Sequence, residues 1–254
     1  LLTWVLTIAV LYRVVVSGNI AYHFGAWAPP WGIEYLIDKI SAFFIVVVSS
    51  ISLVILVYGY QNIHEEIKEN VVGHYYAIFL ILLSALIGIS CSNDLFNIYV
   101  FLEISSIAAA ALVAFNGDKF ALEASLKYLL LSTVGSGTVL LAIAGIYMVT
   151  GHLNLGFIGD SIIQAYASYP LVLLATFGFL MVGLAIKAAL YPLHVWLPDA
   201  HGSAPTTSSA ILSALVVKVY IIIFIKLVLR IFNLEFIASI PIPEVLLVLS
   251  SLAI

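Results

Sequence analysis

The stretch that decides the fold is residues 94–114, DLFNIYVFLEISSIAAAALVA. After Asp94 it holds one charged residue, Glu103, and its apolar residues form a continuous run. A helix needs roughly 20 apolar residues to cross about 30 Å of hydrocarbon, whereas a membrane-barrel strand alternates with a period of two. The stretch therefore predicts a transmembrane helix with a carboxylate about halfway along it.

Stretches of the same kind recur along the chain. The predicted spans are 1–17, 36–58, 74–92, 94–114, 124–150, 170–191 and 206–232, with an eighth beginning near Pro243. The expected fold class is therefore all-α, a polytopic membrane helix bundle of about seven to eight transmembrane helices in a single domain, 1–254. The turn Ser92-Asn93-Asp94 is so short that the helices on either side of it must pack antiparallel.

The composition restricts the function classes. Of 254 residues, 64% are hydrophobic and 9% charged, and the mean hydropathy is +1.20. These charges are too few to cover a soluble enzyme, and a net charge of −4 argues against nucleic acid as a partner. A single cysteine, Cys91, excludes a disulfide framework and an iron–sulfur cluster held within this chain. Because Leu1 is not Met and Ile254 lies in an apolar run, we expect a piece of a longer chain.

Three charged residues lie inside apolar spans: Glu103, Lys187 and Lys218. Each costs roughly 2.5–3.5 kcal/mol at a helix centre, so such groups pair or line a wet path. Lys218 is expected to share a helical face with Ala214, Ile211 and Thr207. One interpretation is an ion pair that only joins helices. The other is a proton relay, because two lysines exceed one glutamate and a buried lysine without a full counter-charge exchanges its proton more readily.

Other cations give weaker signals. Lys127, near the start of the fifth span, either reaches the interface or points inward, and the sequence favours neither. Lys226 and Arg230 lie at the end of the seventh span, where long side chains extend to the membrane surface. The pair Gly135 and Gly137 indicates close helix packing, not a nucleotide loop.

The segment 191–207, YPLHVWLPDAHGSAPTT, contains three prolines and predicts a broken helix near 187–205. Broken helices at membrane depth are tolerated where they line a cavity. His194, Asp199 and His201 are titratable groups that would pass protons into such a cavity. Alternatively, Asp199, Ser203 and Thr206 cap the next helix, and both interpretations can hold together.

The run AIKAALYPLHVWLPDAHGSAPTTSSAILSALVVKVY, residues 185–220, resembles the signature of the antiporter-like membrane subunits. That family spans respiratory complex I, membrane-bound hydrogenases and Mrp-type cation/proton antiporters. NDLFNIYVFLEISSIA at 93–108, ALEASLKYLLLSTVGSG at 121–137 and DKISAFFIVVV at 38–48 fit the same family. The resemblance implies half of an inverted-repeat fold. Its repeat core would be about 74–232, with peripheral helices at 1–58 and the next helix starting at 243–254.

The resemblance also assigns residues. Glu103 in YVFLE, Lys187 in AIKAALYPLH and Lys218 in LVVKVY match the family's translocation residues, and His201 in PDAH matches its connecting histidine. It implies that Glu103 and Lys187 form an ion pair whose opening controls the proton on Lys187. Lys218 would then hand the proton onward. Connections 59–73, 115–123 and 192–205 would face the cytoplasm.

The expected function is therefore proton (or Na⁺/H⁺) translocation by a non-redox subunit of a larger complex in a prokaryotic cytoplasmic or organelle inner membrane. No cofactor or metal is expected in this chain. Iron–sulfur clusters, flavin, Ni–Fe or quinone would belong to partner subunits, which include further antiporter-like subunits. The alternatives are a structural membrane anchor without its own ion path and a subunit of a secondary Na⁺/H⁺ antiporter. A solitary channel or solute transporter ranks last, since the sequence offers no larger polar cluster.

Overall fold

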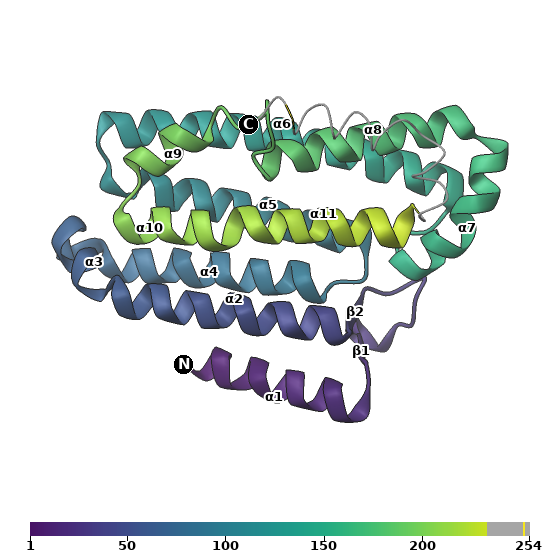
Figure 1. The fold of residues 1–254 in the computed structure, drawn as a ribbon, viewed down its shortest axis with the longest axis horizontal. Helices are drawn as coiled ribbons and strands as arrows, with labels where there is room; N and C mark the ends of the chain where they lie inside the picture. The colour runs from purple at the N-terminus through teal and green to yellow at the C-terminus, as the bar shows by residue number, and fades with distance from the viewer. Residues whose placement is uncertain (233–250, 252–254) are drawn as a thin grey trace.

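The computed structural model describes residues 1–232 and residue 251, and its long helices run side by side along the long axis of the molecule (Figure 1). The elements are α1 (Leu2–Ser17), β1 (Ile20–His23), β2 (Glu34–Ile37), α2 (Lys39–Tyr58), α3 (Tyr60–Glu66), α4 (Val72–Cys91), α5 (Leu95–Val113), α6 (Lys119–Thr150), α7 (Leu155–Ser168), α8 (Pro170–Lys187), α9 (Leu197–Ser203), α10 (Thr206–Ile211) and α11 (Val217–Ile231), with short 3₁₀ turns at Phe24–Ala26, Glu69–Val71 and Ala114–Asn116 and a π-helical segment at Leu212–Val216.

The expected helical membrane bundle is confirmed. In the described part of the chain, the helices long and apolar enough to cross a membrane are Lys39–Tyr58, Glu69–Cys91, Leu95–Asn116, Lys119–Thr150, Pro170–Lys187 and Thr206–Ile231. The span expected at 1–17 forms α1, which has 16 residues. At about 1.5 Å per residue it is shorter than the roughly 30 Å hydrocarbon core. The helix expected near Pro243 lies outside the described residues.

Side-chain caps explain where several helices begin. Asp38, Asp94 and Asp118 each precede a span, and each carboxylate accepts a hydrogen bond from the backbone N–H three residues later. Such caps satisfy donors that the first turn of a helix leaves unpaired. Between Asp94 and the end of α4 lie only Ser92 and Asn93, so α4 and α5 pack antiparallel as expected.

Two elements were not expected from the sequence. The first is the amphipathic helix α7, within residues 150–169. The second is an antiparallel hairpin of β1 and β2 near the two ends of the connection 18–35, in which Ile20 pairs with Ile37 and His23 with Glu34. The hairpin is small, with four residues in each strand. Strands this short carry too few alternating positions to be recognised in an apolar sequence.

Glu34 fastens the hairpin to the helix ends. Its Oε2 accepts hydrogen bonds from Asn93 Nδ2 at 2.7 Å and Asn154 Nδ2 at 2.8 Å, and His23 Nε2 lies 3.4 Å from Oε1. Burial alone would raise the pKa of the Glu34 carboxyl, but the hydrogen bonds from Asn93 and Asn154 outweigh it and hold the pKa below its ordinary value. One carboxylate thus joins β2, the α4–α5 turn and the start of α7.

The tightest helix contact joins α6 and α8, which run together in Figure 1. Gly135 and Gly183 face each other, so that a Cβ built on Gly183 would lie 2.5 Å from the Gly135 carbonyl oxygen. Small residues let two backbones approach closely in membranes, where packing rather than hydrophobic burial drives association. Of the pair expected to pack closely, Gly135 does so, whereas a Cβ on Gly137 would meet no atom within 4 Å among the described residues.

The broken helix near 187–205 is also present. Helix α8 ends at Lys187, Ala189 has a left-handed φ of 52°, and the chain continues through non-helical residues to α9. Trp196, the residue of this segment directly before α9, is fully buried, and its Nε1 donates to the Ile186 carbonyl at 3.0 Å. This bond satisfies a backbone acceptor at the end of α8 and holds the segment against the bundle.

The alternative in which Asp199, Ser203 and Thr206 cap the next helix is wrong. Helix α10 begins after Pro205 without a cap from any of these side chains. Instead the Thr206 backbone N–H donates to Glu66 Oε2 at 2.8 Å. The carboxylate of the last residue of α3 therefore occupies the start of α10.

We expect Gly183→Ala to lower the stability of the protein by about 1–3 kcal/mol, because overpacking forces α6 and α8 apart. Gly178→Ala is the matched control on the same helix: its Cβ would meet no atom within 4 Å, and alanine is the better helix former. The midpoint of thermal unfolding of the full-length protein in detergent measures both. Equal midpoints for the two variants would contradict the close contact.

We expect Glu34→Ala to cost about 1–3 kcal/mol, because it leaves the buried amides of Asn93 and Asn154 without their acceptor. Glu65→Ala, at an exposed position, should be neutral. Since the folded-state pKa of Glu34 lies below its ordinary value of 4.5, its contribution is complete above that pH and is lost as the pH falls through the lowered value. The free energy of unfolding of wild type and Glu34→Ala is measured at neutral and at acidic pH. The difference between the two proteins should shrink in acid, and a difference that stays constant would refute the prediction.

Candidate functional site

The candidate site is built around the lysine at the end of α8. The buried face of α8 passes through Leu173, Leu180 and Leu184, and this helical spacing brings Lys187 onto the same face. The Lys187 side chain is completely buried, with 0% exposure. A charge in such a place requires polar partners, because desolvation without compensation is expensive.

Two hydroxyls supply those partners. Lys187 Nζ donates to Ser106 Oγ of α5 at 2.7 Å and to Ser132 Oγ of α6 at 3.2 Å. The Nζ also lies 5.8 Å from the centre of the Tyr220 ring of α11, where the ring face attracts a cation. The ammonium group thus sits where α5, α6, α8 and α11 meet.

Glu103 stands one helical turn before Ser106 on α5. Its Oε1 is 3.8 Å from Lys187 Nζ, beyond hydrogen-bond distance, and this oxygen is buried with no hydrogen-bond partner among the described residues. The side chain as a whole is 29% exposed. The structure therefore brings Glu103 and Lys187 together as a charge pair in which hydroxyls, not the carboxylate, hold the ammonium.

Further hydroxyls extend this cluster. Tyr220 OH shares a hydrogen bond of 2.8 Å with Ser105 Oγ and lies 3.4 Å from Ser106 Oγ. Tyr128 on α6 is buried, and its hydroxyl makes no hydrogen bond within the described part of the chain. Its ring lies 4.6 Å from that of Trp196. The cluster thus continues from the charge pair toward the broken segment.

Lys218 does not join this cluster. It lies exposed on α11, whereas the predicted face would bury it with Thr207 and Ile211. The cause is the π-helical segment Leu212–Val216, whose wider turn rotates every later residue about the helix axis. After it the buried positions are Val219, Tyr220, Ile223, Leu227 and Ile231.

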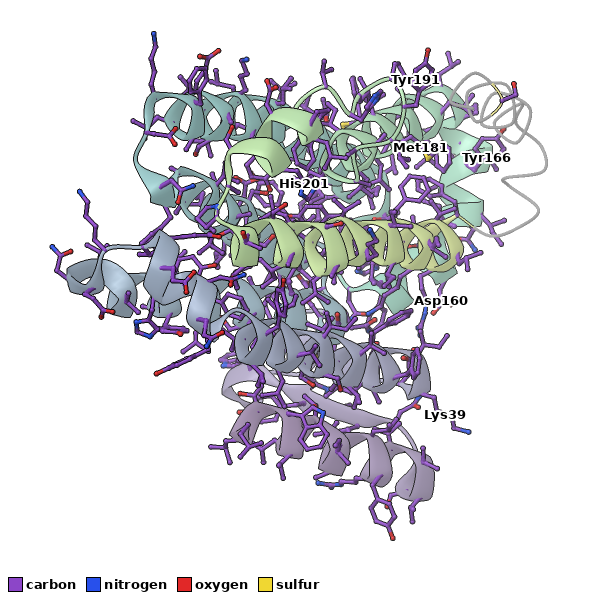
Figure 2. All side chains as sticks on the ribbon, turned by 60° about the vertical axis from the view of Figure 1, so that its left-hand side comes forward. Lys39, Asp160, Tyr166, Met181, Tyr191 and His201 are labelled. Carbon is purple, nitrogen blue, oxygen red and sulfur yellow. The ribbon has the colours of Figure 1, made fainter. Side chains whose placement is uncertain are left out.

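Of the remaining relay candidates near the broken segment, all but His194 fall into two groups. Lys127 is half exposed and its Nζ lies 3.0 Å from both Glu123 Oε1 and Asp199 Oδ2, so Lys127 points outward. His201, on the inner side of α9 (Figure 2), lies with its Nδ1 2.9 Å from Ser209 Oγ.

Burial lowers the pKa of His201, and the positive charge of Lys218 lowers it further. Lys218 is therefore within electrostatic reach of His201. His194 is half-buried, stacks against Tyr191 with ring centres 5.7 Å apart, and has a buried Nδ1 without a hydrogen-bond partner in the described residues. It joins neither group.

Lys226 behaves differently from the expectation that it extends to the membrane surface. Its Nζ turns inward and donates to the Ser90 and Ser92 carbonyls, each at 3.1 Å. Carbonyls at the end of α4 lack helical partners and carry partial negative charge, which attracts a lysine. Arg230 does remain at the surface, where its Nη2 is 2.7 Å from Asp38 Oδ2.

Among the described residues, no group of three or more His, Cys, Asp and Glu is arranged to hold a metal ion. The polar side chains that complete the site, Ser106, Ser132, Tyr128 and Tyr220, were not selected from the sequence. The signal available was the three-residue spacing from Glu103 to Ser106, which places both on one helical face. Ser132 carried no comparable signal, because nothing in the sequence aligns α6 with α5.

Comparison with known proteins decides the family. Residues 92–254 match the model of the family described as "NADH:quinone oxidoreductase/Mrp antiporter, TM". The chain belongs to this family.

Relatives within the family come from two kinds of protein. The chain is 40% identical over 198 residues to NADH-quinone oxidoreductase subunit N of Desulforudis audaxviator, covering 78% of this chain and 39% of the relative. It is 30% identical over 217 residues to a Na⁺/H⁺ antiporter subunit of Alkalihalophilus pseudofirmus, covering 85% and 43%. The chain thus spans about two fifths of the length of these relatives.

Solved structures agree on the fold. A chain of the membrane-bound sulfane sulfur reductase, an archaeal respiratory membrane complex, matches with a TM-score of 0.88 and 30% identity, over 99% of this chain and 50% of that one. A chain of the Mrp complex from Dietzia matches with a TM-score of 0.80 and 23% identity, over 91% and 42%. The antiporter-like family fold expected from residues 185–220 is confirmed.

A double-mutant cycle tests whether the hydroxyls hold Lys187. Ser106→Ala should cost about 1.5–3 kcal/mol, because hydrogen bonds to charged groups are the stronger ones. Ser105→Ala is the matched control: both serines donate to the Leu102 carbonyl, but the other partner of Ser105 is the neutral Tyr220. In a Lys187→Met background the penalty for Ser106→Ala should fall to that for Ser105→Ala. Unfolding of the full-length protein in detergent measures the cycle, and an unchanged penalty would rule out the bond.

Proposed function

We propose that this chain is part of an ion-translocating membrane subunit in which Glu103 and Lys187 carry a proton-transfer step. The observation that supports the proposal is the geometry of Lys187: a fully buried ammonium held by Ser106 and Ser132, with its counter-charge 3.8 Å away. A pair that only joined helices would be better served by a direct, hydrogen-bonded contact.

Glu103 and Lys187 attract each other without a direct hydrogen bond, and this gives the pair a role in proton transfer. Two unit charges about 4 Å apart attract each other by roughly 4 kcal/mol at an effective dielectric constant of about 20. Moving Glu103 away would remove this attraction while the hydroxyls stay in place. The stability of the protonated lysine therefore depends on the position of Glu103, and motion of α5 becomes coupled to proton release from Lys187.

The next proton carriers in the proposal are Lys218 and His201. His201 is within electrostatic reach of Lys218, which lies in the middle of the span Thr206–Ile231. In the proposal, His194 and Asp199 of the broken segment, with Lys127 of α6 paired to Asp199, connect the pathway to the membrane surface. Lys218 is exposed. For Lys218 to accept the proton directly from Lys187, α11 would have to turn a different face toward the bundle.

The whole protein that contains this chain is proposed to work in a multisubunit complex of the complex I, hydrogenase or Mrp type, with further antiporter-like subunits as partners. The support is that relatives are named as subunits of NADH-quinone oxidoreductase and of Na⁺/H⁺ antiporters. Flavin, iron–sulfur, Ni–Fe or quinone chemistry would reside in the partners. The proposed location is a prokaryotic cytoplasmic membrane or an organelle inner membrane, and the transported ion is H⁺, with Na⁺/H⁺ exchange as the alternative.

The test is ion transport by the intact complex in sealed vesicles. Lys187→Met should reduce proton transport to background, because the buried proton carrier is lost while the side-chain volume is nearly kept. Lys119→Met, at an exposed lysine at the start of α6, should leave transport at the wild-type level. Assembly of each variant complex is measured in parallel on native gels.

Two results would contradict the proposal. If assembled Lys187→Met complex transports protons normally, the pair is structural and the chain acts as a membrane anchor. If wild-type vesicles take up radioactive sodium with no change in internal pH, the step carries sodium ions and not protons.

A further inference from the structure

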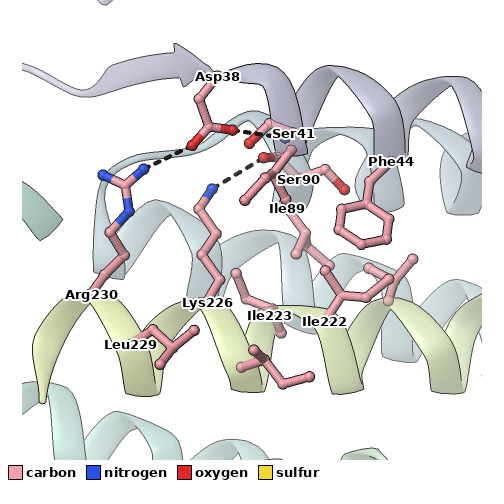
Figure 3. A pocket seen from close by; sticks show the side chains of 13 residues that line it. Asp38, Ser41, Phe44, Ile89, Ser90, Ile222, Ile223, Lys226, Leu229 and Arg230 are labelled. Carbon is pink, nitrogen blue, oxygen red and sulfur yellow. Dashed lines mark hydrogen bonds and ion pairs between the residues drawn. The ribbon is translucent and has the colours of Figure 1, made fainter. Parts of the chain in front are cut away.

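A pocket of about 260 Å³ lies between α2, α4 and α11, at the end of the bundle where α2 begins and α11 ends (Figure 3). It shares no residue with the cluster around Lys187. The residues that line it are Asp38, Ile40, Ser41, Phe44, Ile89, Ser90, Val219, Ile222, Ile223, Ile225, Lys226, Leu229 and Arg230. One end is charged and the rest is apolar.

The charged end carries a surplus of positive charge. Asp38 is the single carboxylate among the lining residues, against the two cations Lys226 and Arg230. Both Asp38 oxygens are engaged, Oδ1 by the Ser41 N–H at 2.7 Å and Oδ2 by Arg230 Nη2 at 2.7 Å. Arg230 is 40% exposed, and a guanidinium has five N–H donors. It therefore retains donors for an anion that approaches from outside.

The apolar part runs into the membrane from this end. Ile40 and Phe44 belong to the span Lys39–Tyr58, while Ile222, Ile225 and Leu229 belong to the span Thr206–Ile231. Arg230 and Asp38 lie at the ends of those same spans. Ile40, Ile225 and Leu229 are themselves more than half exposed, so the pocket is open on the side that faces away from the bundle.

This layout matches one kind of molecule. A cation at the level of the membrane surface above an apolar groove in the hydrocarbon is complementary to a lipid with an anionic headgroup and an acyl chain. We propose that the pocket binds an anionic phospholipid of the bilayer, with its phosphate against Arg230 and near Lys226, and an acyl chain between Ile222 of α11 and Phe44 of α2. The site does not depend on ion translocation.

The experiment uses the intact complex in vesicles that contain phosphatidylglycerol and phosphatidylcholine in equal amounts, with one of the two carrying a photoreactive acyl chain. After illumination, mass spectrometry of the digested chain locates the label. The label should lie on the pocket-lining segments of α2 and α11, and phosphatidylglycerol should give several-fold more of it than phosphatidylcholine.

Three variants separate this site from general attraction to the membrane surface. Arg230→Gln should reduce the phosphatidylglycerol label to the level of phosphatidylcholine. Ile222→Trp, which keeps the charged end and fills the groove, should remove the label of both lipids from the pocket. Lys39→Gln is the matched control: Lys39 is an exposed cation at the same end of α2, points away from the bundle (Figure 2) and does not line the pocket. It should leave the label unchanged.

The proposal is overturned if the two lipids label the wild-type pocket equally, or if Arg230→Gln and Lys39→Gln reduce the label alike. It is also overturned if the pocket-lining segments of the intact complex take no lipid label. Ile222→Trp leaves the Asp38–Arg230 pair intact. It therefore still tests whether the lipid occupies the groove if the Arg230→Gln variant misfolds.

Discussion

Burial of the positive charge on Lys187 is the constraint on which the rest of the structure depends. An ammonium group deep in an apolar bundle needs acceptors and a counter-charge. No single helix supplies them: Ser106 and Glu103 come from α5 and Ser132 from α6. Packing of α5, α6 and α8 around one point is therefore required by electrostatics as well as by apolar contact.

Close helix approach makes that arrangement possible. Gly183 lies one helical turn before Lys187, and Gly135 lies three residues after Ser132, so the glycine contact is adjacent to the lysine on both helices. A Cβ on Gly183 would lie 2.5 Å from the Gly135 carbonyl oxygen, so a larger side chain there would push α6 and α8 apart beside the serine that binds Lys187. Ser132, which binds the ammonium group, and the two glycines, which let α6 and α8 approach each other, therefore belong to the same helix contact.

The spans could be predicted from the length of the apolar runs, and the broken helix from the three prolines in 191–207. Charges inside apolar runs marked Glu103 and Lys187 as unusual, but the expectation that they pair with each other came from the family resemblance. The sequence did not allow the face of Lys218 to be predicted, because periodicity assumes a uniform α-helix and the π-helical segment at 212–216 breaks it. Ser132 was missed because serine is common in membrane helices and its neighbour on α8 is remote in the chain. The inward turn of Lys226 depends on carbonyls at Ser90 and Ser92 that only the tertiary fold places there.

Because of the π-helical segment, the buried face of α11 does not continue the helical periodicity of α10. Each residue of an α-helix turns it by about 100°, and the extra residue held in the wide turn shifts everything downstream by that amount. Before it, Thr207 and Ile211 face the bundle; after it, Val219 and Ile223 do so, and Lys218 is turned aside. The side that α11 presents to its neighbours therefore depends on the number of residues that precede it as well as on their chemical character.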